Sequence, residues 1–539
     1  MVSGAEIMVK CLELEGVQIA FGYPGAAICP FYDFLYQSNI RHVLVREEQN
    51  AAHAASGYAR SAGRPGVCIA TSGPGATNLI TGIATAYMDS VPLVAITGQV
   101  NSELLGRDVF QEADITGACE PFTKHSYLVK RAEELPRIFK EAFHIASTGR
   151  PGPVLIDVPV DVQQAEIPEF HYPEKAAIIG YKPRTQGHAL QIRKALEAIE
   201  KAQRPIICCG GGVVLAGARE ELIAFAKNSG IPVCATMMGI GVIPMDNPHY
   251  LGMIGMHGRT SANRAMKEAD LVILCGARVG DRAVSAPQQI AEKAVVVHID
   301  IDPAEIGKNM PVDVPIVGDI RIVMRALADQ VKNTVPQEWL DQTLGYKKTY
   351  PSRGEPRTDS VEPRVFIRDL SPMMQDNAIL VADVGQNQIW AARNFNVKEG
   401  RFLTSGGLGT MGYSIPAAIG AKLAKPHRQV VAVCGDGSFQ MSMCELGTLC
   451  QEGAAVKIIV MENGRLGMVK EFQDRLYGKR YMATVLRGDP DFVKLAEAYG
   501  IPAARAETNE QAKELARTML ETDGPFILVC RVDPDVPSI

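Results

Sequence analysis

The stretch that decides the fold is Val430–Leu446, VVAVCGDGSFQMSMCEL, in which an apolar segment runs into a carboxylate between two glycines. The apolar start is typical of a buried strand, and the Met- and Leu-rich part after the glycines is typical of a helix. Asp436 therefore stands at the carboxyl end of a predicted strand. Taken alone, Gly-Asp-Gly indicates a tight turn in which Asp436 caps the helix. A binding role for Asp436 needs support from other residues.

Length and composition exclude several classes of function. The 539 residues suffice for three or more domains, and 47% of them are hydrophobic against 21% charged, as in soluble globular proteins. The formal net charge of -5 and the pI near 6.1 provide no basic surface for nucleic acid or an anionic membrane. We expect neither kind of partner.

The N-terminal residues and the cysteines indicate a cytoplasmic protein. Glu6 and Lys10 interrupt the apolar segment that a signal peptide would need, and no apolar run is long enough to span a bilayer. The 12 cysteines are scattered, some of them in apolar runs (Cys68, Cys275 and Cys434), and they form no Cys-x-x-Cys pair. We expect reduced, buried cysteines.

A short β-branched run, a Gly-rich turn and a helical segment recur along the chain, which is the pattern of parallel α/β sheets. Residues 67–98 and 430–463 share this layout without sharing sequence. The first and last thirds are therefore predicted to have related folds.

Two polar stretches rich in Pro, Gly and charge, near 169–189 and 333–363, have the composition of linkers. Between and around them we predict three consecutive α/β domains with mainly parallel sheets. Their limits are 1–168, 189–333 and 363–539.

Asn463 supplies the first support for a binding role of Asp436. It lies one helix and one strand further on, in IIVMENGRLGMV, so two adjacent parallel strands would bring both side chains to one sheet edge. Carboxylate and amide oxygens suit Mg2+, which few protein ligands hold and phosphate oxygens complete. A helix opening at Ser438 would direct its N–H groups toward those phosphates. This predicts a magnesium and phosphate site.

The spacing from GDGSF to Glu462-Asn463 resembles the fingerprint of thiamine diphosphate enzymes, which starts with GDG and usually ends in Asn-Asn. Glu462 replaces the first Asn, and the ligand position, Asn463, is kept. The resemblance implies thiamine diphosphate and Mg2+ as cofactors. It also implies that the backbone carbonyl of Arg465 completes the protein's share of the metal shell.

Such enzymes also need an acid that faces the aminopyrimidine ring of the cofactor. In VLVREEQNAAHAASGYARSAG the catalytic glutamate of the family aligns with Glu48. The alternative is a solvated glutamate at a helix start beside Glu47. Together with Asp436 and Asn463, the alignment favours catalysis.

Eight further motifs, spread in order over nearly the whole chain, resemble the catalytic subunits of acetohydroxyacid (acetolactate) synthases. They are FGYPGAA, TSGPGATN, FQEADITG, GRPGPVLIDVP, GMIGMHG, VHIDIDPAEIGK, TSGGLGTMGYSIPAAIG and RLGMVKEFQDRLY. The resemblance implies a pyrimidine-binding first domain, an FAD-binding-like middle domain and a diphosphate-binding last domain. It implies a thiamine enzyme that decarboxylates pyruvate and joins the two-carbon unit to pyruvate or 2-ketobutyrate in branched-chain amino acid biosynthesis.

The same resemblance implies FAD as a structural cofactor and a homodimer or homotetramer with its active site between subunits. It also admits a small regulatory subunit as a partner. Since the glutamate lies in the first domain and the metal site in the last, a monomer is expected to be inactive.

The resemblance assigns site residues one by one. The residues that it places at the diphosphate are Gly385, Gln386, Asn387, Gly437 and Ser438. Met411 would lie beneath the bent cofactor, and the Gly409 carbonyl would take the aminopyrimidine amine. Without the resemblance, Met411 would be interpreted as a core residue.

Other residues are assigned to the substrates. Phe110, Gln111 and Lys130 would border the reacting carbonyl, and Arg282 would pair with the carboxylate of the second 2-keto acid. Phe472 stands where the family usually has a tryptophan that selects 2-ketobutyrate. For Lys130 and Arg282 the alternative is surface ion pairing.

The middle domain carries the positions that match the FAD site. They are Gly211, Gly212, Met256, His257, Gly276, Arg278, Asp300, Ile301 and Asp319. For His257 the alternative is a core histidine, but its glycine-flanked setting favours a flat ligand.

Some positions depart from the family pattern. Glu120 stands where many members have an arginine near the flavin, Ala26 replaces the second glycine of GYPGG, and the sequence ends at DPDVPSI without the usual tail. Together with Phe472, these departures bear on FAD affinity, acceptor preference and capping of the active site.

Two other functions fit part of the sequence. A pyruvate oxidase-type enzyme would use the flavin as its electron acceptor, so flavin reduction during pyruvate turnover would identify it. A non-catalytic α/β nucleotide-binding or scaffold protein would require Glu48, Asp436 and Asn463 to be incidental, and would not bind thiamine diphosphate.

Overall fold

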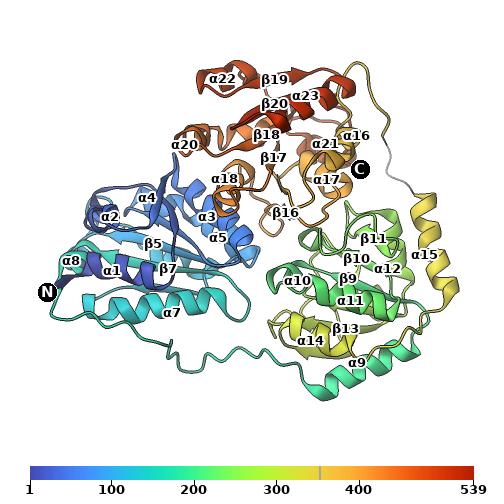
Figure 1. Ribbon diagram of the computed structural model, residues 1–539, viewed down its shortest axis with the longest axis horizontal. Helices are drawn as coiled ribbons and strands as arrows, with labels where there is room; N and C mark the ends of the chain where they lie inside the picture. Colours follow the sequence, from blue (N-terminus) through green and yellow to red (C-terminus); the bar gives the residue numbers. More distant parts are fainter. Residues whose placement is uncertain (351–353) are drawn as a thin grey trace.

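The computed structural model describes residues 1–350 and 354–539, in which three six-stranded sheets follow one another along the chain (Figure 1). All strand pairs within these three sheets are parallel. The prediction of consecutive α/β domains with mainly parallel sheets is confirmed.

The first sheet has the order β3-β2-β4-β5-β7-β6. Its strands are β2 (Ile19–Gly22), β3 (Arg41–Leu44), β4 (Gly66–Ala70), β5 (Leu93–Gln99), β6 (His125–Leu128) and β7 (Pro153–Pro159). The helices around it are α1 (Gly4–Leu14), α2 (Cys29–Tyr36), α3 (Glu48–Ala62), α4 (Pro74–Asn78), α5 (Ile80–Met88), α6 (Ile115–Cys119), α7 (Leu135–Ser147) and α8 (Val160–Gln164). A small antiparallel pair, β1 (Val2–Ser3) and β8 (Glu166–Ile167), brings the two ends of this domain together.

The last sheet has the order β16-β15-β17-β18-β20-β19. Its strands are β15 (Ile379–Ala382), β16 (Arg401–Leu403), β17 (Val430–Gly435), β18 (Val456–Glu462), β19 (Ala503–Ala506) and β20 (Phe526–Arg531). Its helices are α16 (Pro363–Leu370), α17 (Gln386–Asn394), α18 (Ser414–Ala424), α19 (Asp436–Gln440), α20 (Leu446–Gln451), α21 (Gly467–Leu476), α22 (Phe492–Ala498) and α23 (Asn509–Glu521). In both sheets the second strand stands first, followed by the first, third, fourth, sixth and fifth. The prediction that the first and last thirds of the chain have related folds is confirmed.

The middle sheet has a different order, β11-β10-β9-β12-β13-β14, which is the order of Rossmann folds. Its strands are β9 (Pro205–Cys209), β10 (Val233–Ala235), β11 (Tyr250–Met253), β12 (Leu271–Cys275), β13 (Val295–Asp300) and β14 (Val314–Val317). Its helices are α9 (Ala189–Lys201), α10 (Gly211–Leu215), α11 (Arg219–Ser229), α12 (Thr260–Glu268), α13 (Pro287–Ala291), α14 (Ile320–Ala328) and α15 (Gln337–Thr349). The switch point lies between β9 and β12, where ligands bind in such sheets.

The two predicted linkers differ in the structure. Residues 168–188 contain no helix or strand and cross from the first domain to the middle one (Figure 1). The second prediction is wrong over α15, which packs on α12. Trp339 of α15 is 2% exposed and donates from Nε1 to the Pro205 carbonyl at 2.9 Å. Residues 351–353 of this predicted linker lie outside the described part of the chain.

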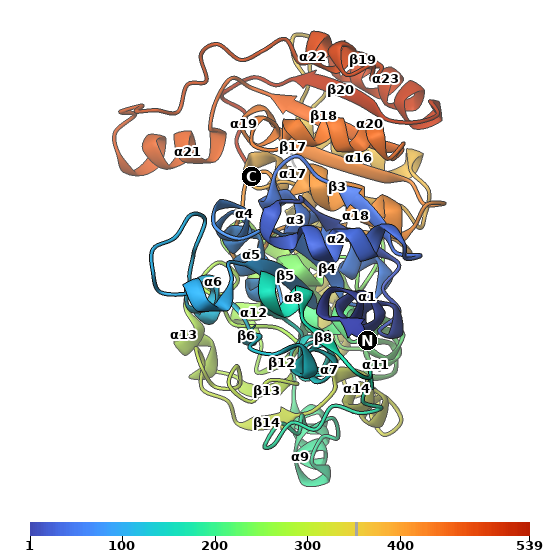
Figure 2. The same ribbon diagram turned by 90° about the vertical axis from the view of Figure 1, so that its left-hand side faces the viewer.

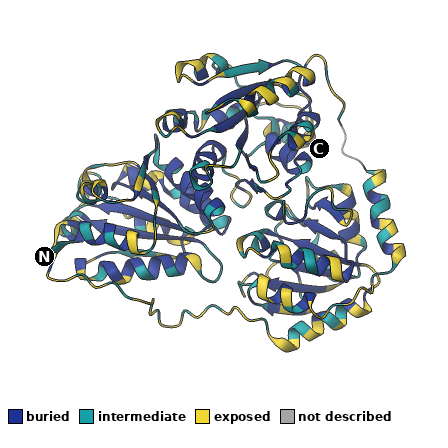
Figure 3. Cartoon of the chain, in the orientation of Figure 1, coloured by how far each residue is buried: buried dark blue, intermediate teal, exposed yellow. Residues whose placement is uncertain are grey.

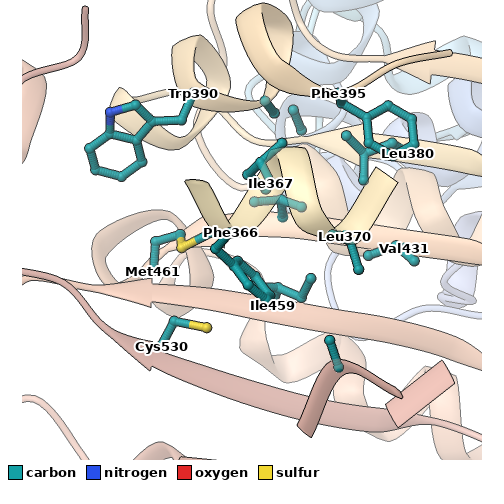
Figure 4. Close-up of a cluster of buried hydrophobic side chains, with 14 of the residues drawn as sticks. Phe366, Ile367, Leu370, Leu380, Trp390, Phe395, Val431, Ile459, Met461 and Cys530 are labelled. Atoms are coloured by element: carbon teal, nitrogen blue, oxygen red, sulfur yellow. The ribbon is translucent and has the colours of Figure 1, made fainter. Parts of the chain in front are cut away.

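The central strands of each sheet consist almost entirely of buried residues, and the exposed residues gather on the outer sides of the helices (Figure 3). In the last domain Phe366, Leu370 and Trp390 pack against Val431 and Met461 (Figure 4). This core fixes α16 and α17 against β17 and β18, so the ends of these strands have a rigid base.

Cys68, Cys275 and Cys434 are buried and free of disulfides, as expected. No helix in the described ranges has the length and apolar character to cross a bilayer.

The first and last domains meet through α3 and α18. A Cβ added to Gly57 would lie 2.0 Å from the Ala417 carbonyl oxygen, and one added to Gly420 would lie 1.9 Å from that of Ala54. Only glycine allows this backbone approach. Glu445, fully buried, accepts hydrogen bonds from the Asn50 side chain at 3.0 Å and the Arg46 N–H at 2.9 Å. These contacts hold the last sheet in a fixed position beside the first.

Candidate active site

The β15–β17–β18 register determines where Asp436 lies. Val381 pairs with Ala432, which pairs with Ile458, so the three strands end side by side. The Asp436 carboxylate, 1% exposed, accepts from the N–H of Gly437 at 2.9 Å and of Asn463 at 2.9 Å. Burial raises the pKa of Asp436 to about 6, and its N–H donors oppose this rise. A cation beside the carboxylate would favour its charged form.

Asn463 has an amide whose two ends face different partners. Its Oδ1 accepts from the Arg465 N–H at 3.0 Å, and its Nδ2 donates to Gln386 Oε1 at 3.1 Å. Asp436 Oδ2 also accepts from the Gly464 N–H at 2.6 Å. The turn after β18 is thus built around the Asp436 carboxylate, and the predicted neighbourhood of Asp436 and Asn463 is present.

The remaining predicted diphosphate residues lie around the same edge. Gly385, at a φ of +142°, precedes α17, and Asn387 donates to the carbonyls of Asp383 at 2.8 Å and Val433 at 3.2 Å. Ser438 Oγ accepts from the Gly435 N–H at 3.1 Å. Helix α17 begins at this edge directly after Gly385, and the unpaired N–H groups of a helix start suit an anion.

Asp383 is a site residue that the sequence analysis missed. It is fully buried and accepts from the N–H groups of Gly412 at 2.9 Å and Ser414 at 2.8 Å. It thereby fastens the loop that contains Gly409 and Met411 to the end of β15. Like Asp436, it directly follows a short apolar run, here Ile379–Ala382, which is the signal that could have found it.

A cavity of about 1560 Å³ extends from this edge to the switch point of the middle sheet. It is lined by most of the predicted cofactor residues: Gly385, Gln386, Asn387, Gly409, Met411, Gly437, Ser438, Gly211, Gly212, His257, Gly276, Arg278, Asp300, Ile301 and Asp319. Asp436, Asn463, Arg465, Arg282 and Phe472 line it as well. Residues of the first domain, among them Arg60, Asp89 and Arg150, line it too, so all three domains contribute to one cavity that is large enough for more than one cofactor.

At the switch point the ends of β9 and β12 approach closely. A Cβ on Gly212 would come within 2.7 Å of the Gly276 Cα, so the backbones of these predicted residues form a cavity wall without side chains. Burial lowers the pKa of His257, which lines the cavity. Met256 is not among the described lining residues, although its N–H donates to the Arg282 carbonyl at 3.0 Å.

Two arginines of the cavity bear on the flavin prediction. Arg278 donates to the Met88 carbonyl at 2.6 Å, so it joins the middle and first domains. Arg150, from GRPGPVLIDVP, lines the cavity and pairs with Glu305 at 2.8 Å, and the sequence analysis did not single it out. Glu120 is exposed and lies outside the described cavity lining. The acid does not face the cavity that the predicted flavin residues line.

The first domain holds a separate group of predicted residues. Glu48 begins α3 and is half-buried, and its Oε2 accepts from Asn78 Nδ2 at 3.0 Å. Gln111, at a φ of +59°, lies against Gly73, and Phe110 is 87% exposed. Lys130 is exposed.

In the described part of the chain, Glu48, Phe110, Gln111 and Lys130 do not line the cavity of the last domain. Within one chain, these four residues and the residues around Asp436 therefore form two separate groups. The loop before α6 and the projecting helix α21 lie on the same side of the molecule (Figure 2).

Glu462, which replaces the usual first Asn of the fingerprint, is accommodated by Arg505. The Arg505 guanidinium donates to the Glu462 carboxylate and lies 3.7 Å from Asp491. The Glu462 carbonyl accepts from the Val532 N–H at 2.8 Å. With Glu462 at this position, the end of β18 still pairs in the sheet, and the Asn463 N–H still donates to the Asp436 carboxylate.

The fold and the site define a thiamine pyrophosphate (thiamine diphosphate) enzyme. Residues 2–118 match the family of the thiamine pyrophosphate enzyme N-terminal TPP binding domain. Residues 192–327 match the central domain of these enzymes, and residues 383–530 match their C-terminal TPP binding domain.

Relatives of high similarity narrow the class. The chain is 48% identical to a probable acetolactate synthase large subunit of Methanocaldococcus jannaschii, over 98% of this chain and 92% of the relative. It is 49% identical to the acetolactate synthase large subunit of Corynebacterium glutamicum, over 98% and 86%. An acetolactate synthase of Mycobacterium bovis is 47% identical over 95% and 85%. The chain belongs to the acetolactate synthase large-subunit family.

Proposed function

We propose that this chain is a thiamine diphosphate-dependent acetolactate synthase that decarboxylates pyruvate and joins the two-carbon unit to a second 2-keto acid. The observation that carries the proposal is that Asp436, Asn463 and the start of α17 meet in the cavity that also contains Arg282 and Phe472. Incubation with pyruvate, thiamine diphosphate and Mg2+ should yield acetolactate. Acetaldehyde or acetate as the product would contradict the proposal. None of the relatives reported above is named an oxidase.

The residues present fit a magnesium ion and a diphosphate. Mg2+ would be held by the Asp436 carboxylate, Asn463 Oδ1 and the Arg465 carbonyl, which are the oxygen donors that this ion prefers. Bound thiamine diphosphate supplies the electron sink that permits loss of CO2 from a 2-keto acid. The backbone N–H groups at the start of α17 would hold its phosphates, with Gly437 and Ser438 on the other side.

The remaining residues orient the substrates and move protons. Glu48, held by Asn78, would keep a proton at its carboxyl opposite the aminopyrimidine ring. The side chain of Arg282 is 66% exposed, and its guanidinium would pair with the carboxylate of the acceptor acid. Phe110, Gln111 and Lys130 would border the reacting carbonyl. The glycine-lined wall of the middle domain would take FAD, with Arg278 and Asp300 beside it.

We propose that two copies of the chain complete each active site, and that a small regulatory subunit binds the assembly. The proposal rests on the separation of Glu48 from the cavity that contains Asp436. If the halves come from different subunits, co-expressed Glu48→Gln and Asp436→Ala chains should regain activity, because each mixed dimer contains one intact site. About a quarter of the wild-type activity is expected for random dimers.

The measurement is acetolactate formation by the mixture and by each variant alone. Recovery in the mixture, with neither variant active by itself, is the expected result. No recovery, in a mixture shown by tagged chains to contain mixed dimers, would place both halves within one chain.

Phe472→Trp should increase the preference for 2-ketobutyrate over pyruvate as acceptor. Phe472 lines the cavity and is half-buried, and the two acceptors differ by one methylene, for which an apolar pocket supplies about 1–3 kcal/mol. An indole covers more of that methylene than a phenyl ring. The test is a competition between the two keto acids, read as the ratio of 2-aceto-2-hydroxybutyrate to acetolactate. An unchanged or lower ratio would show that this position does not select the acceptor.

A further inference from the structure

A chain of hydrogen bonds leads from the metal site to helix α21 and the residues near the end of the sequence. Asn463 Nδ2 donates to Gln386 Oε1 at 3.1 Å, and Gln386 Nε2 donates to Glu471 Oε1 at 2.7 Å. Ser538 donates to the same carboxylate, from its N–H to Oε1 at 2.5 Å and from Oγ to Oε2 at 2.7 Å. The metal site and α21 are thus joined by two side-chain amides and one carboxylate.

The chemistry of the groups fixes the direction of these bonds. An ionised carboxylate can only accept, and so can the Val536 carbonyl, to which Gln386 Nε2 donates at 3.1 Å. Both acceptors face the same end of Gln386, so its NH2 must point toward them and its oxygen toward Asn463. Asn463 must then present its own NH2 to Gln386, which leaves Oδ1 on the metal side.

The side chains in this chain of hydrogen bonds are largely buried. Gln386 is 5% exposed, Ser538 is fully buried, and the Glu471 side chain retains 13% exposure. Water therefore has little access to replace a lost partner. The Trp390 indole donates to the Pro537 carbonyl at 2.9 Å, which fixes the segment that contains Ser538.

We propose that Glu471 is a positioning residue which, through Gln386, holds the amide oxygen of Asn463 toward the metal. The inference rests on the proposed function, because it takes Asn463 to be a metal ligand. Glu471 would not contact the metal, the cofactor or the substrates. Its loss would lower the affinity for the metal, as is usual for groups that orient a metal ligand by a hydrogen bond and do not contact the metal.

The test is a calorimetric Mg2+ titration of the full chain in saturating thiamine diphosphate, without pyruvate. Glu471→Ala should weaken Mg2+ binding by about 10- to 100-fold. Glu471→Gln should stay close to wild type, because the Ser538 N–H can only donate and holds the new amide oxygen where Gln386 needs an acceptor. Asp474→Ala removes the same charge from α21 without a bond to Gln386, so it should bind Mg2+ like wild type.

A double-mutant cycle distinguishes positioning from general weakening. If Glu471 acts through Gln386, the double variant Glu471→Ala with Gln386→Ala should bind Mg2+ no more weakly than Gln386→Ala alone. Additive losses, or wild-type affinity in Glu471→Ala, would overturn the inference. Should Glu471→Ala fail to fold, Glu471→Met keeps the length of the side chain without an acceptor and should show the same loss. A wild-type protein that does not bind thiamine diphosphate with Mg2+ would instead refute the proposed function.

Discussion

Glu48→Gln is expected to lower the rate of acetolactate formation by about 100-fold or more, while folding and thiamine diphosphate binding stay largely unchanged. Glutamine keeps the shape and can still accept the bond from Asn78 Nδ2, but it cannot exchange a proton with the cofactor ring. The loss should therefore fall on turnover alone. Initial rates with pyruvate, together with calorimetric titration of thiamine diphosphate, separate the two effects.

Glu47→Gln is the matched control for this variant. Glu47 is the neighbouring acid, and its carboxylate accepts from the Asn50 N–H at 3.1 Å as the cap of α3. A glutamine can still accept that bond, so Glu47→Gln should keep wild-type turnover. Wild-type turnover in Glu48→Gln, or equal losses in both variants, would remove Glu48 from the mechanism.

The fold was predictable because its signals are local. Each strand of the parallel sheets is a short apolar run that ends in a turn, as at Val430–Gly435, and this layout recurs in all three domains. Helix α15 was missed because its buried side chains include Thr343 and Tyr346 beside Trp339. The spacing of these three residues is helical, but only one of them is clearly apolar. Its neighbourhood of Pro, Gly and charge has the composition of a linker.

The site was predictable where two strand ends meet and not where distant segments meet. Asp436 and Asn463 follow adjacent strands, so their proximity follows from the parallel order. Asp383 binds N–H groups 29 and 31 residues away, and Ser538 binds Glu471 from 67 residues away. The periodicity of apolar residues predicts helices and strands, but it does not predict contacts between side chains so far apart in the sequence. The separation of Glu48 from the cavity that Asp436 lines is likewise a property of how the domains pack.

Asp436→Ala should abolish Mg2+-dependent binding of thiamine diphosphate, because the diphosphate would lose the ion that joins it to the protein. The Asp436 carboxylate also organises the turn after β18, since it accepts from the N–H groups of Asn463 and Gly464. Truncation to alanine leaves those donors without an acceptor, so some loss of stability is expected as well. Asp436→Asn removes the charge and one acceptor oxygen, but its amide oxygen can still accept from the Asn463 and Gly464 N–H groups. It should therefore fold more like wild type and still bind the metal poorly.

Asp489→Ala provides the matched control for Asp436→Ala. Asp489 is a neighbouring acid that accepts from Gln440 Nε2 at 2.9 Å and does not line the described cavity. Its loss changes the local charge by the same amount without removing a metal ligand. Calorimetric titration of thiamine diphosphate with and without Mg2+, beside a thermal melt, separates cofactor binding from folding. If Asp436→Ala and Asp436→Asn bound the cofactor as tightly as Asp489→Ala does in Mg2+, the metal site would have to lie elsewhere in the cavity. The backbone N–H groups at the start of α17 would then have to hold the diphosphate without a metal bridge to Asp436.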